Sequence, residues 1–119
     1  MRFTLSSSAL SSKLSALSKV INSKNALPIL GDFVFDIQGK DLNLTASDSE
    51  NTMRTTVMLT ESDGDGRFAI GNHDLLEAVK GFSEQPITFD VNFEQSIVKI
   101  SYQNGLFSLP IENADEYPI

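Results

Sequence analysis

Residues 26–53 read ALPILGDFVFDIQGKDLNLTASDSENTM, and this stretch decides the fold. Apolar and polar residues alternate in three runs, and each run keeps its apolar side chains on one parity, as a strand with one dry face requires. The dry-face positions are Phe33, Phe35 and Ile37, then Leu42, Leu44 and Ala46, then Met53, Thr55, Val57 and Leu59, whereas Asp32, Val34 and Asp36 fall on the wet face of the first run. Turns are expected at residues 38–41, where Gly39 is free to take a positive φ, and at residues 47–50. The pattern predicts an antiparallel meander that buries one face.

The residues before this stretch predict a strand followed by a helix. Phe3 and Leu5 share one parity in residues 2–6, and the serines at 6–8 can cap a helix by accepting an otherwise unpaired N–H bond. One apolar stripe with helical spacing then follows: Leu10, Leu14, Leu17 and Ile21. Residues 22–25 end the helix, and Pro28 prevents its return.

The residues after the meander repeat the series in a shorter form. We expect a strand over 67–70, a short helix with Asn72 as N-cap and Gly81 after its end, and three further strands. Their apolar positions are Leu75, Leu76 and Val79, then Ile87, Phe89, Val91 and Phe93, then Val98, Ile100 and Tyr102. Asn104-Gly105 is a hairpin signal that returns the chain over residues 106–109. This order predicts two βαβββ halves with eight strands and two helices, an α+β fold with both helices packed on one face of antiparallel sheet.

Length and composition favour one domain over residues 1–119, with residues 114–118 as a linker that leaves it. The chain has no cysteine, which excludes disulfides and thiolate metal sites, and no apolar segment long enough to span a membrane. We therefore expect a cytoplasmic protein. The net charge of −7 by itself argues against nucleic acid, but net charge does not describe the local field of one face.

The usual catalytic and metal-binding patterns are missing from the sequence. Residues 61–66 (ESDGDG) invite a calcium interpretation, but the spacing lacks the closing glutamate, so a solvated hairpin turn is favoured. His73 is the only histidine, and Asp48 and Glu50 lie in a serine-rich turn that uses aspartate for backbone hydrogen bonds. We expect no catalytic site, no metal and no cofactor.

The basic residues are more informative. Lys13, Lys19 and Lys24 lie on the first predicted helix or just after it, Lys80 ends the second, and residues 1–31 contain no acid. Two interpretations stay open: ordinary solvent-facing lysines, or a diffuse positive helix face that contacts DNA phosphates without reading sequence.

The motifs LPILGDFVFDI and LNLTASDSENTM resemble the N-terminal domain of the bacterial sliding clamp, the β subunit of DNA polymerase III. The opening MRFTLSSSAL, the helix text LLEAVKG and the closing stretch from Phe107 to Pro118 follow in the order of that family, so the resemblance spans nearly the whole chain. Ser49 and Asp32 depart from the residues that the family commonly carries at these positions. A whole clamp chain has three such domains, whereas this sequence covers the first.

The resemblance implies a DNA-clamp domain with antiparallel sheets on the outside and helices lining a channel. It implies a processivity factor, an accessory subunit of a DNA-directed DNA polymerase without a catalytic site of its own, whose full-length homodimer encircles double-stranded DNA. The other implied partners are the replicative polymerase and the clamp loader, and the chain alone is expected to be monomeric. The positions implied for DNA contact are Lys24 first, then Lys80, His73 and Lys13.

Ring closure in that family joins the edge of this domain to another chain, so the last strand, residues 106–109, is the candidate edge. Phe107 and Leu109 are its implied anchors, with Lys99 and Tyr102 flanking the contact. A competing interpretation makes Phe107 and Leu109 core residues of a small sheet. An alternative from another functional class is a stand-alone acidic, β-rich module that binds a protein.

Overall fold

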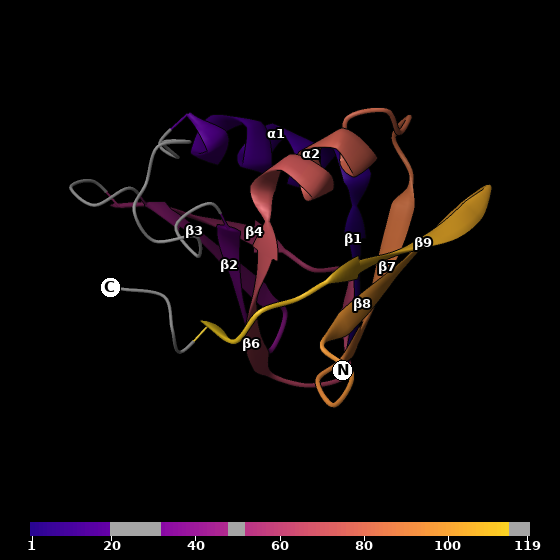
Figure 1. Cartoon of the computed structure of the whole chain (residues 1–119). Helices are drawn as coiled ribbons and strands as arrows, with labels where there is room; N and C mark the ends of the chain where they lie inside the picture. Colours follow the sequence, from indigo (N-terminus) through magenta and orange to yellow (C-terminus); the bar gives the residue numbers. More distant parts are fainter. Residues whose placement is uncertain (20–31, 48–51, 115–119) are drawn as a thin grey trace.

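The computed structural model describes residues 1–19, 32–47 and 52–114, which Figure 1 shows as two sheets beneath two helices. In chain order the elements are β1 (Arg2–Ser6), α1 (Ser7–Ser18), β2 (Asp32–Gln38), β3 (Asp41–Ser47), β4 (Thr52–Met58), β5 (Glu61–Ser62), β6 (Gly66–Gly71), α2 (Asn72–Val79), β7 (Pro86–Asn92), β8 (Ile97–Tyr102) and β9 (Gly105–Pro110). One sheet has the strand order β5-β1-β7-β8-β9 and the other β4-β3-β2-β6. Every strand pair within them is antiparallel. The predicted α+β class is confirmed.

The two βαβββ halves exchange their first strands. β1 leaves its own half and pairs with β7, and β6 pairs with β2. Each sheet therefore contains three consecutive strands of one half and the leading strand of the other. Because each half completes the sheet of its partner half, the two halves depend on one another for their hydrogen bonds.

Four phenylalanines fill the space between the sheets. Phe3 and Phe89 face one another across β1 and β7 with ring centroids 4.9 Å apart, and Phe35 and Phe68 do the same across β2 and β6 at 5.2 Å. Phe35 also lies 5.8 Å from Phe89, which joins the two pairs. Stacked and tilted aromatic pairs at these distances add roughly 1 kcal/mol each to the burial of their area. We call the space between the two sheets, which these four rings fill, the seam; the exchanged strands β1 and β6 meet there.

The two helices lie side by side on one side of the sheets (Figure 1), and α1 also packs against β1, β3 and β4. Leu10, Leu14 and Leu17 are buried, as the apolar stripe predicts, and the Ser6 side chain caps α1 by accepting a bond of 3.2 Å from the Ala9 N–H. No helix in the described part of the chain has the length and apolar character needed to cross a membrane.

The predicted cap of α2 was wrong by one residue, because Gly71 is the N-cap and Asn72 is the first helical residue. Gly71 still pairs with Asp32 as the last residue of β6, so the chain passes directly from strand into helix. Leu75 and Val79 are buried, as predicted, and Leu76 is partly buried against the core.

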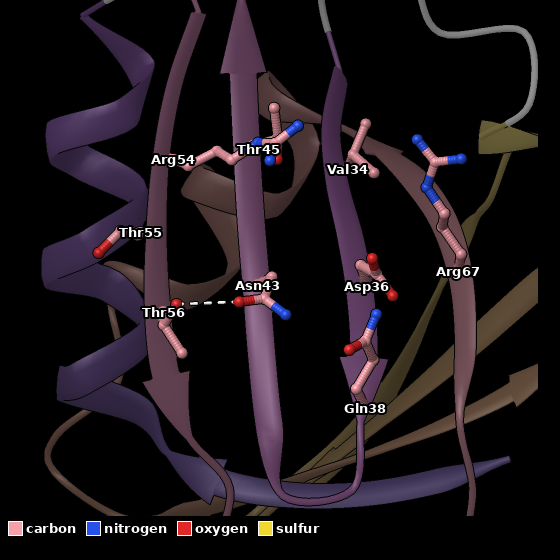
Figure 2. A pocket seen from close by; sticks show the side chains of 9 residues that line it. All are labelled: Val34, Asp36, Gln38, Asn43, Thr45, Arg54, Thr55, Thr56 and Arg67. Carbon is pink, nitrogen blue, oxygen red and sulfur yellow. Dashed lines mark hydrogen bonds between the residues drawn. The ribbon is translucent and has the colours of Figure 1, made fainter. Parts of the chain in front are cut away.

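The wet face assigned to the first run of the meander was also wrong, because Asp32 and Val34 are both buried. Val34 lies between the side chains of Thr45 and Arg67 on the outer face of the β2–β3–β6 region (Figure 2). A backbone bridge joins Glu112 to Ala69 and adds the segment after β9 beside the edge of β6. Alternation in sequence thus predicted the dry face of β2 but not the burial of Asp32 and Val34 on its other face.

Two strand assignments and one dry-face position differ from the sequence prediction. β7 stops at Asn92, whose side-chain oxygen accepts the Gln95 N–H at 3.1 Å, so Phe93 lies in the following turn and is 49% exposed. Met53 is 43% exposed because β4 is an end strand. Glu61–Ser62, expected in a loop, forms β5 against β1, which makes nine strands in the described residues.

Two turns follow from glycine. Gly39 has φ of +64° between β2 and β3, as predicted, and its N–H donates to Asp65 Oδ1 at 2.8 Å. The predicted hairpin between β8 and β9 is confirmed, although Gly105 pairs with Tyr102 and the loop itself is Gln103-Asn104. A Cβ at Gly105 would lie 2.9 Å from the Tyr102 hydroxyl, so a larger residue there would have to displace the Tyr102 side chain.

The described fold extends beyond the last strand to Ala114, which is buried and was predicted to begin a linker. Ser47, predicted to begin a turn, is instead the last residue of β3. Residues 48–50 of that turn, the end of the first helix after Lys19 and the linker after Ala114 lie outside the described residues.

Candidate nucleic-acid interface and sheet edge

The exposed side of α1 carries positive charge without compensation from its own helix. α1 and its C-cap, residues 7–19, contain two lysines, Lys13 and Lys19, and no acidic residue. Both lysines are exposed, opposite the buried leucine stripe. Since no acid lies within a helical turn of Lys13 on α1, its ammonium group is available to a phosphate oxygen.

The predicted residues on α2 have a different electrostatic setting. Lys80 Nζ donates to Glu77 Oε1 at 2.9 Å, and this hydrogen bond, with the Lys80 charge, lowers the pKa of Glu77 below its usual value. His73, exposed in the first turn, also favours the ionised form of Glu77. Together with Asp74, these groups make α2 less basic than α1. The structure therefore places His73 and Lys80 on α2, next to α1. Acidic residues of α2 partly neutralise their charges, whereas α1 has no acidic residue to neutralise its lysines.

Lys24, the first choice from the sequence, lies outside the described residues. Lys13, His73 and Lys80 lie within them, and the helices that carry them are in contact. The assignment of all four to DNA contact stays a prediction.

The candidate edge strand is at the end of its sheet, as expected. β8 is the only strand neighbour of β9 in the described residues, which leaves the other edge of β9 without a strand partner there. Phe107 and Leu109 stand opposite Ile100 and Val98, which are buried, so both side chains lie on the inner face of the sheet. Leu106 is on the outer face and 57% exposed.

Phe107 belongs to a small aromatic cluster at the end of α2. Its ring centroid lies 6.1 Å from that of Phe82 and 6.0 Å from that of Tyr102, and Phe82 and Tyr102 are stacked at 4.6 Å. Phe107 and Leu109 are each partly buried against the core. The sequence left open whether Phe107 and Leu109 are anchors of an edge contact or core residues. In the structure they pack against the core and also belong to a strand at the end of its sheet. Sequence reasoning missed Phe82 because it lies outside every periodic run.

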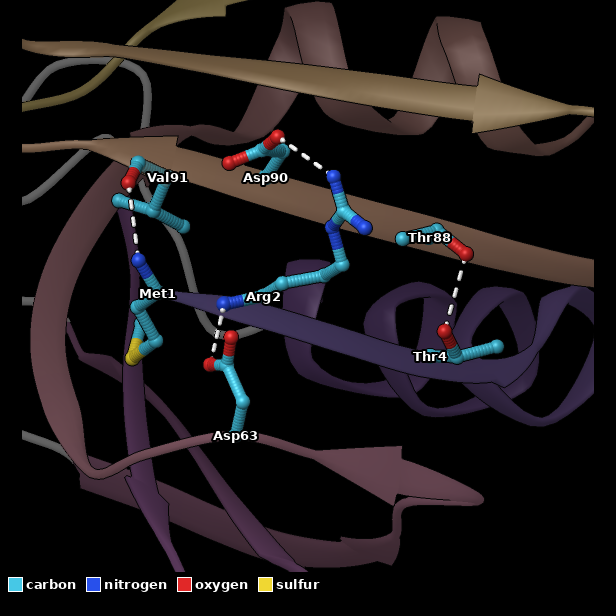
Figure 3. Close-up of polar contacts among 7 residues, drawn as sticks. All are labelled: Met1, Arg2, Thr4, Asp63, Thr88, Asp90 and Val91. Atoms are coloured by element: carbon cyan, nitrogen blue, oxygen red, sulfur yellow. Dashed lines mark hydrogen bonds and ion pairs between the residues drawn. The ribbon is translucent and has the colours of Figure 1, made fainter.

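Lys99 and Tyr102 do not flank one common surface, because they point to opposite faces of β8. Lys99 is exposed on the outer face, directly across from Asp90 on β7. Figure 3 shows the neighbouring part of this face, where the Arg2 guanidinium contacts Asp90 Oδ2 at 3.3 Å and Thr4 bonds to Thr88. The Lys99 charge thus continues a row of alternating charges across three strands.

The outer face of the other sheet carries a shallow cavity of about 520 Å³ that the sequence analysis did not anticipate. Figure 2 shows its polar lining, in which Thr56 Oγ1 donates to Asn43 Oδ1 at 2.9 Å and Arg54 and Arg67 extend from β4 and β6. Arg54 and Arg67 are separated by two strands, and the wet-face parity of their strands was the signal that could have placed them together.

The polar 61–66 segment contributes backbone contacts. Asp63 Oδ1 accepts the Arg2 N–H at 2.8 Å (Figure 3), and Asp65 accepts that of Gly39. Nowhere in residues 1–19, 32–47 and 52–114 do three histidine, cysteine or acidic side chains gather in a way that could hold a metal ion.

Comparison with known proteins gives one consistent result. The family described as "DNA polymerase III beta subunit, N-terminal domain" matches residues 1–119. The curated "Beta sliding clamp" of Haemophilus influenzae is 25% identical over 118 residues, which are 99% of this chain and 32% of that protein. The protein of the same name from Vibrio harveyi is 26% identical over 99% of this chain and 81% of its own length.

Solved structures agree. The Helicobacter pylori beta clamp bound to a DNA ligase peptide has a TM-score of 0.91 at 24% identity, and the match covers all of this chain and 33% of that one. The DNA polymerase III subunit beta from Pseudomonas aeruginosa has a TM-score of 0.90 at 22% identity, with coverage of 100% and 32%. The chain therefore spans about a third of the length of most of these relatives.

Proposed function

Because the chain belongs to the family of the DNA polymerase III beta subunit, as its N-terminal domain, we propose that it is one unit of a ring around duplex DNA that tethers the replicative polymerase. Residues 1–119 act as one domain of that ring, and the exchanged strands support this view. The domain performs no catalysis itself and serves in the cytoplasm as an accessory subunit of a DNA-directed DNA polymerase.

The observation that carries the proposal is that the two helices share one side of the molecule, while each sheet ends in strands that have only one strand neighbour in the described residues. Of these end strands, β4 belongs to one sheet and β9 to the other. A unit with two different edges can join copies or homologous domains head to tail, and such contacts form a ring when the rotation closes. The helices of every unit then face the same way, toward the bore.

Within that bore, Lys13 supplies the clearest phosphate contact, because α1 offers it no acidic partner. Lys24, Lys80 and His73 complete the proposed set, with the contribution of Lys80 reduced by its bond to Glu77. Such point charges position DNA without reading sequence. A closed ring holds DNA by enclosure, so a few weak contacts are enough and the net charge of −7 is no obstacle.

The β9 edge, with Phe107 and Leu109 on its inner face, is the proposed contact for ring closure in a full-length homodimer. The chain alone lacks the partner edge and is expected to sediment as a monomer. The replicative polymerase and the clamp loader are the proposed partners of the complete protein.

The test compares retention of the complete protein on nicked circular DNA and on the same DNA after linearisation. We expect protein to remain on the circle through a high-salt wash and to be lost from the linear form, because enclosure fails at free ends. Equal retention on both forms would contradict the ring.

The 119-residue chain provides the matched control. With about four positive groups it should bind linear duplex weakly, with a log–log salt slope no steeper than roughly −3.6. Tight, sequence-specific binding by the chain alone would indicate a direct reader of DNA. If the complete protein is retained on neither the circular nor the linear DNA and instead binds another protein, the alternative of an acidic protein-binding module is favoured.

A further inference from the structure

The first residue of β2 carries a carboxyl group that the fold buries without giving it a donor. Asp32 is 5% exposed, and its Oδ2 atom has no hydrogen-bond partner in the described part of the chain. Across the strand pair it faces Gly71, which has no side chain to offer, and a Cβ there would lie 3.8 Å from Asp32 Oδ1. An ionised carboxylate in such a place is costly, because it has lost water and gained no compensating bond.

A second carboxyl group lies against it. Glu112 belongs to the segment that follows β9, and its backbone exchanges two hydrogen bonds with Ala69 on the outer edge of β6, at 3.0 and 2.8 Å. Ala69 is also the strand partner of Val34, two residues from Asp32, so the Glu112 carboxyl group lies near Asp32 and is one cause of the raised pKa of Asp32. Two ionised carboxylates have no proton to place between them, whereas one proton on Asp32 converts the contact into an O–H···O bond.

The surroundings favour the protonated form of Asp32. Burial, then the hydrogen bond with Glu112, then the Glu112 charge raise the pKa of Asp32 to about 8. Of the other charged groups nearby, Asp36 and Arg67 face one another two pairs further along β2 and β6, and His73 and Asp74 follow Gly71 in the first turn of α2. None of these four is among the causes of the Asp32 shift.

We propose that Asp32 and Glu112 form a proton-shared latch that holds residues 111–114 against β6, and that loss of the proton from Asp32 releases this segment. The Ile111 N–H donates to the Ser96 carbonyl at 3.0 Å, and this bond marks the fixed end of the segment. Beyond it, the Glu112 bridge and the buried Ala114 side chain hold the chain in place. The latch therefore sets the path by which the chain leaves the fold, and it operates whether or not the domain belongs to a ring.

The test measures hydrogen exchange of the Ala69 and Glu112 amides by NMR in the 119-residue chain. Their protection factors, corrected for the intrinsic pH dependence of exchange, are expected to fall between pH 6 and pH 8 by up to about tenfold per pH unit and then to level off. The Thr60 amide, which donates to the Thr4 carbonyl at 2.8 Å in another part of the molecule, is the internal control and should lose less protection than the Ala69 and Glu112 amides. A flat profile for Ala69 and Glu112 would overturn the latch.

Two matched variants isolate the group. Asp32→Asn keeps the shape and supplies a permanent N–H donor toward Glu112, so protection of both amides should stay high and independent of pH. Asp36→Asn, on the same strand and the same face, should keep the wild-type profile. The same fall in Asp32→Asn as in the unchanged chain would show that another group is responsible.

A direct titration keeps the proposal testable if Asp32→Asn does not fold. The side-chain carboxyl carbon of Asp32 in the unchanged chain should titrate with a midpoint near 8. A midpoint below about 5, close to the ordinary range of aspartate, would overturn the proposal.

Discussion

The buried carboxyl group of Asp32 should make the whole chain less stable as the pH rises through neutrality. In the unfolded chain the group has its ordinary pKa of 3.8 and has lost its proton at pH 6, whereas in the folded chain its pKa is about 8 and the proton stays. The folded state therefore binds more protons than the unfolded state between these values. Under that condition the free energy of unfolding decreases as the pH increases.

The two pKa values set the size of the effect. They give a loss of about 2 kcal/mol in the free energy of unfolding between pH 6 and pH 8, and of less than about 0.5 kcal/mol between pH 8 and pH 9. Domains of this size are stable by roughly 5–15 kcal/mol, so the loss is a substantial fraction of the total.

Urea unfolding at pH 6, 7, 8 and 9 and constant ionic strength measures this profile. Asp32→Asn should flatten it and should be more stable than the unchanged chain at pH 8, since an amide bears no charge to bury. Asp36→Asn should retain the wild-type slope because Asp36 is half-buried and lies opposite Arg67. An equal slope in Asp32→Asn, or a decline that continues undiminished above pH 8, would refute the reasoning.

Three further outcomes are expected. Ser7→Ala should lower the free energy of unfolding, measured in urea, by about 2 kcal/mol, because it removes the hydroxyl that accepts the Gln85 N–H at 3.1 Å and leaves this buried donor unpaired. Unchanged stability would show that a water molecule takes the place of the hydroxyl. Leu109→Asp should lower the melting temperature of the chain itself, since this side chain is partly buried against the core, and an unaltered melt would place it at a contact with another chain. Lys13→Glu should reduce retention of the complete protein on circular DNA, by less at high salt, whereas Lys40→Glu in a strand turn should not; equal losses would mean that only net charge matters.

Much of the fold could be predicted because alternation reports directly on burial. The parity of Leu42 and Leu44, and of Ile87 and Phe89, gave the buried face of β3 and β7, and the leucine spacing gave that of α1. Gly39 was placed from the turn chemistry alone. In each case the signal lies within one element, where sequence spacing and spatial spacing coincide.

The strand exchange could not be predicted in the same way. A period of two indicates which face of β1 is dry, but it does not indicate whether β1 pairs with β2 or with β7. The burial of Asp32 was missed for a similar reason, since Glu112, which acts on it, is distant in sequence. Arg54 and Arg67 likewise meet on one face only because β2 and β3 bring their strands together.

The sequence predicted which helices carry positive charge, but not which of these charges are paired with a nearby acid. The lysines on the predicted helices include Lys13 and Lys80, but their count does not show that Glu77, three residues before Lys80, pairs with it. The odd spacing of Lys99 and Tyr102 on β8 places their side chains on opposite faces, so the prediction that both flank one contact was wrong.

A ring of units joined head to tail closes only if each unit holds its two contact edges at a fixed angle. The two edges proposed for these contacts belong to β4 and β9, which lie in different sheets. Independent sheets could slide against each other and change that angle. The exchanged strands oppose this motion because β1 ties the first half to β7 and β6 ties the second half to β2, and the stacked rings of Phe3, Phe35, Phe68 and Phe89 fill the seam between them. Close-packed interiors resist such displacement, so the strand exchange that sequence periodicity could not reveal would also fix the geometry that the proposed ring closure requires.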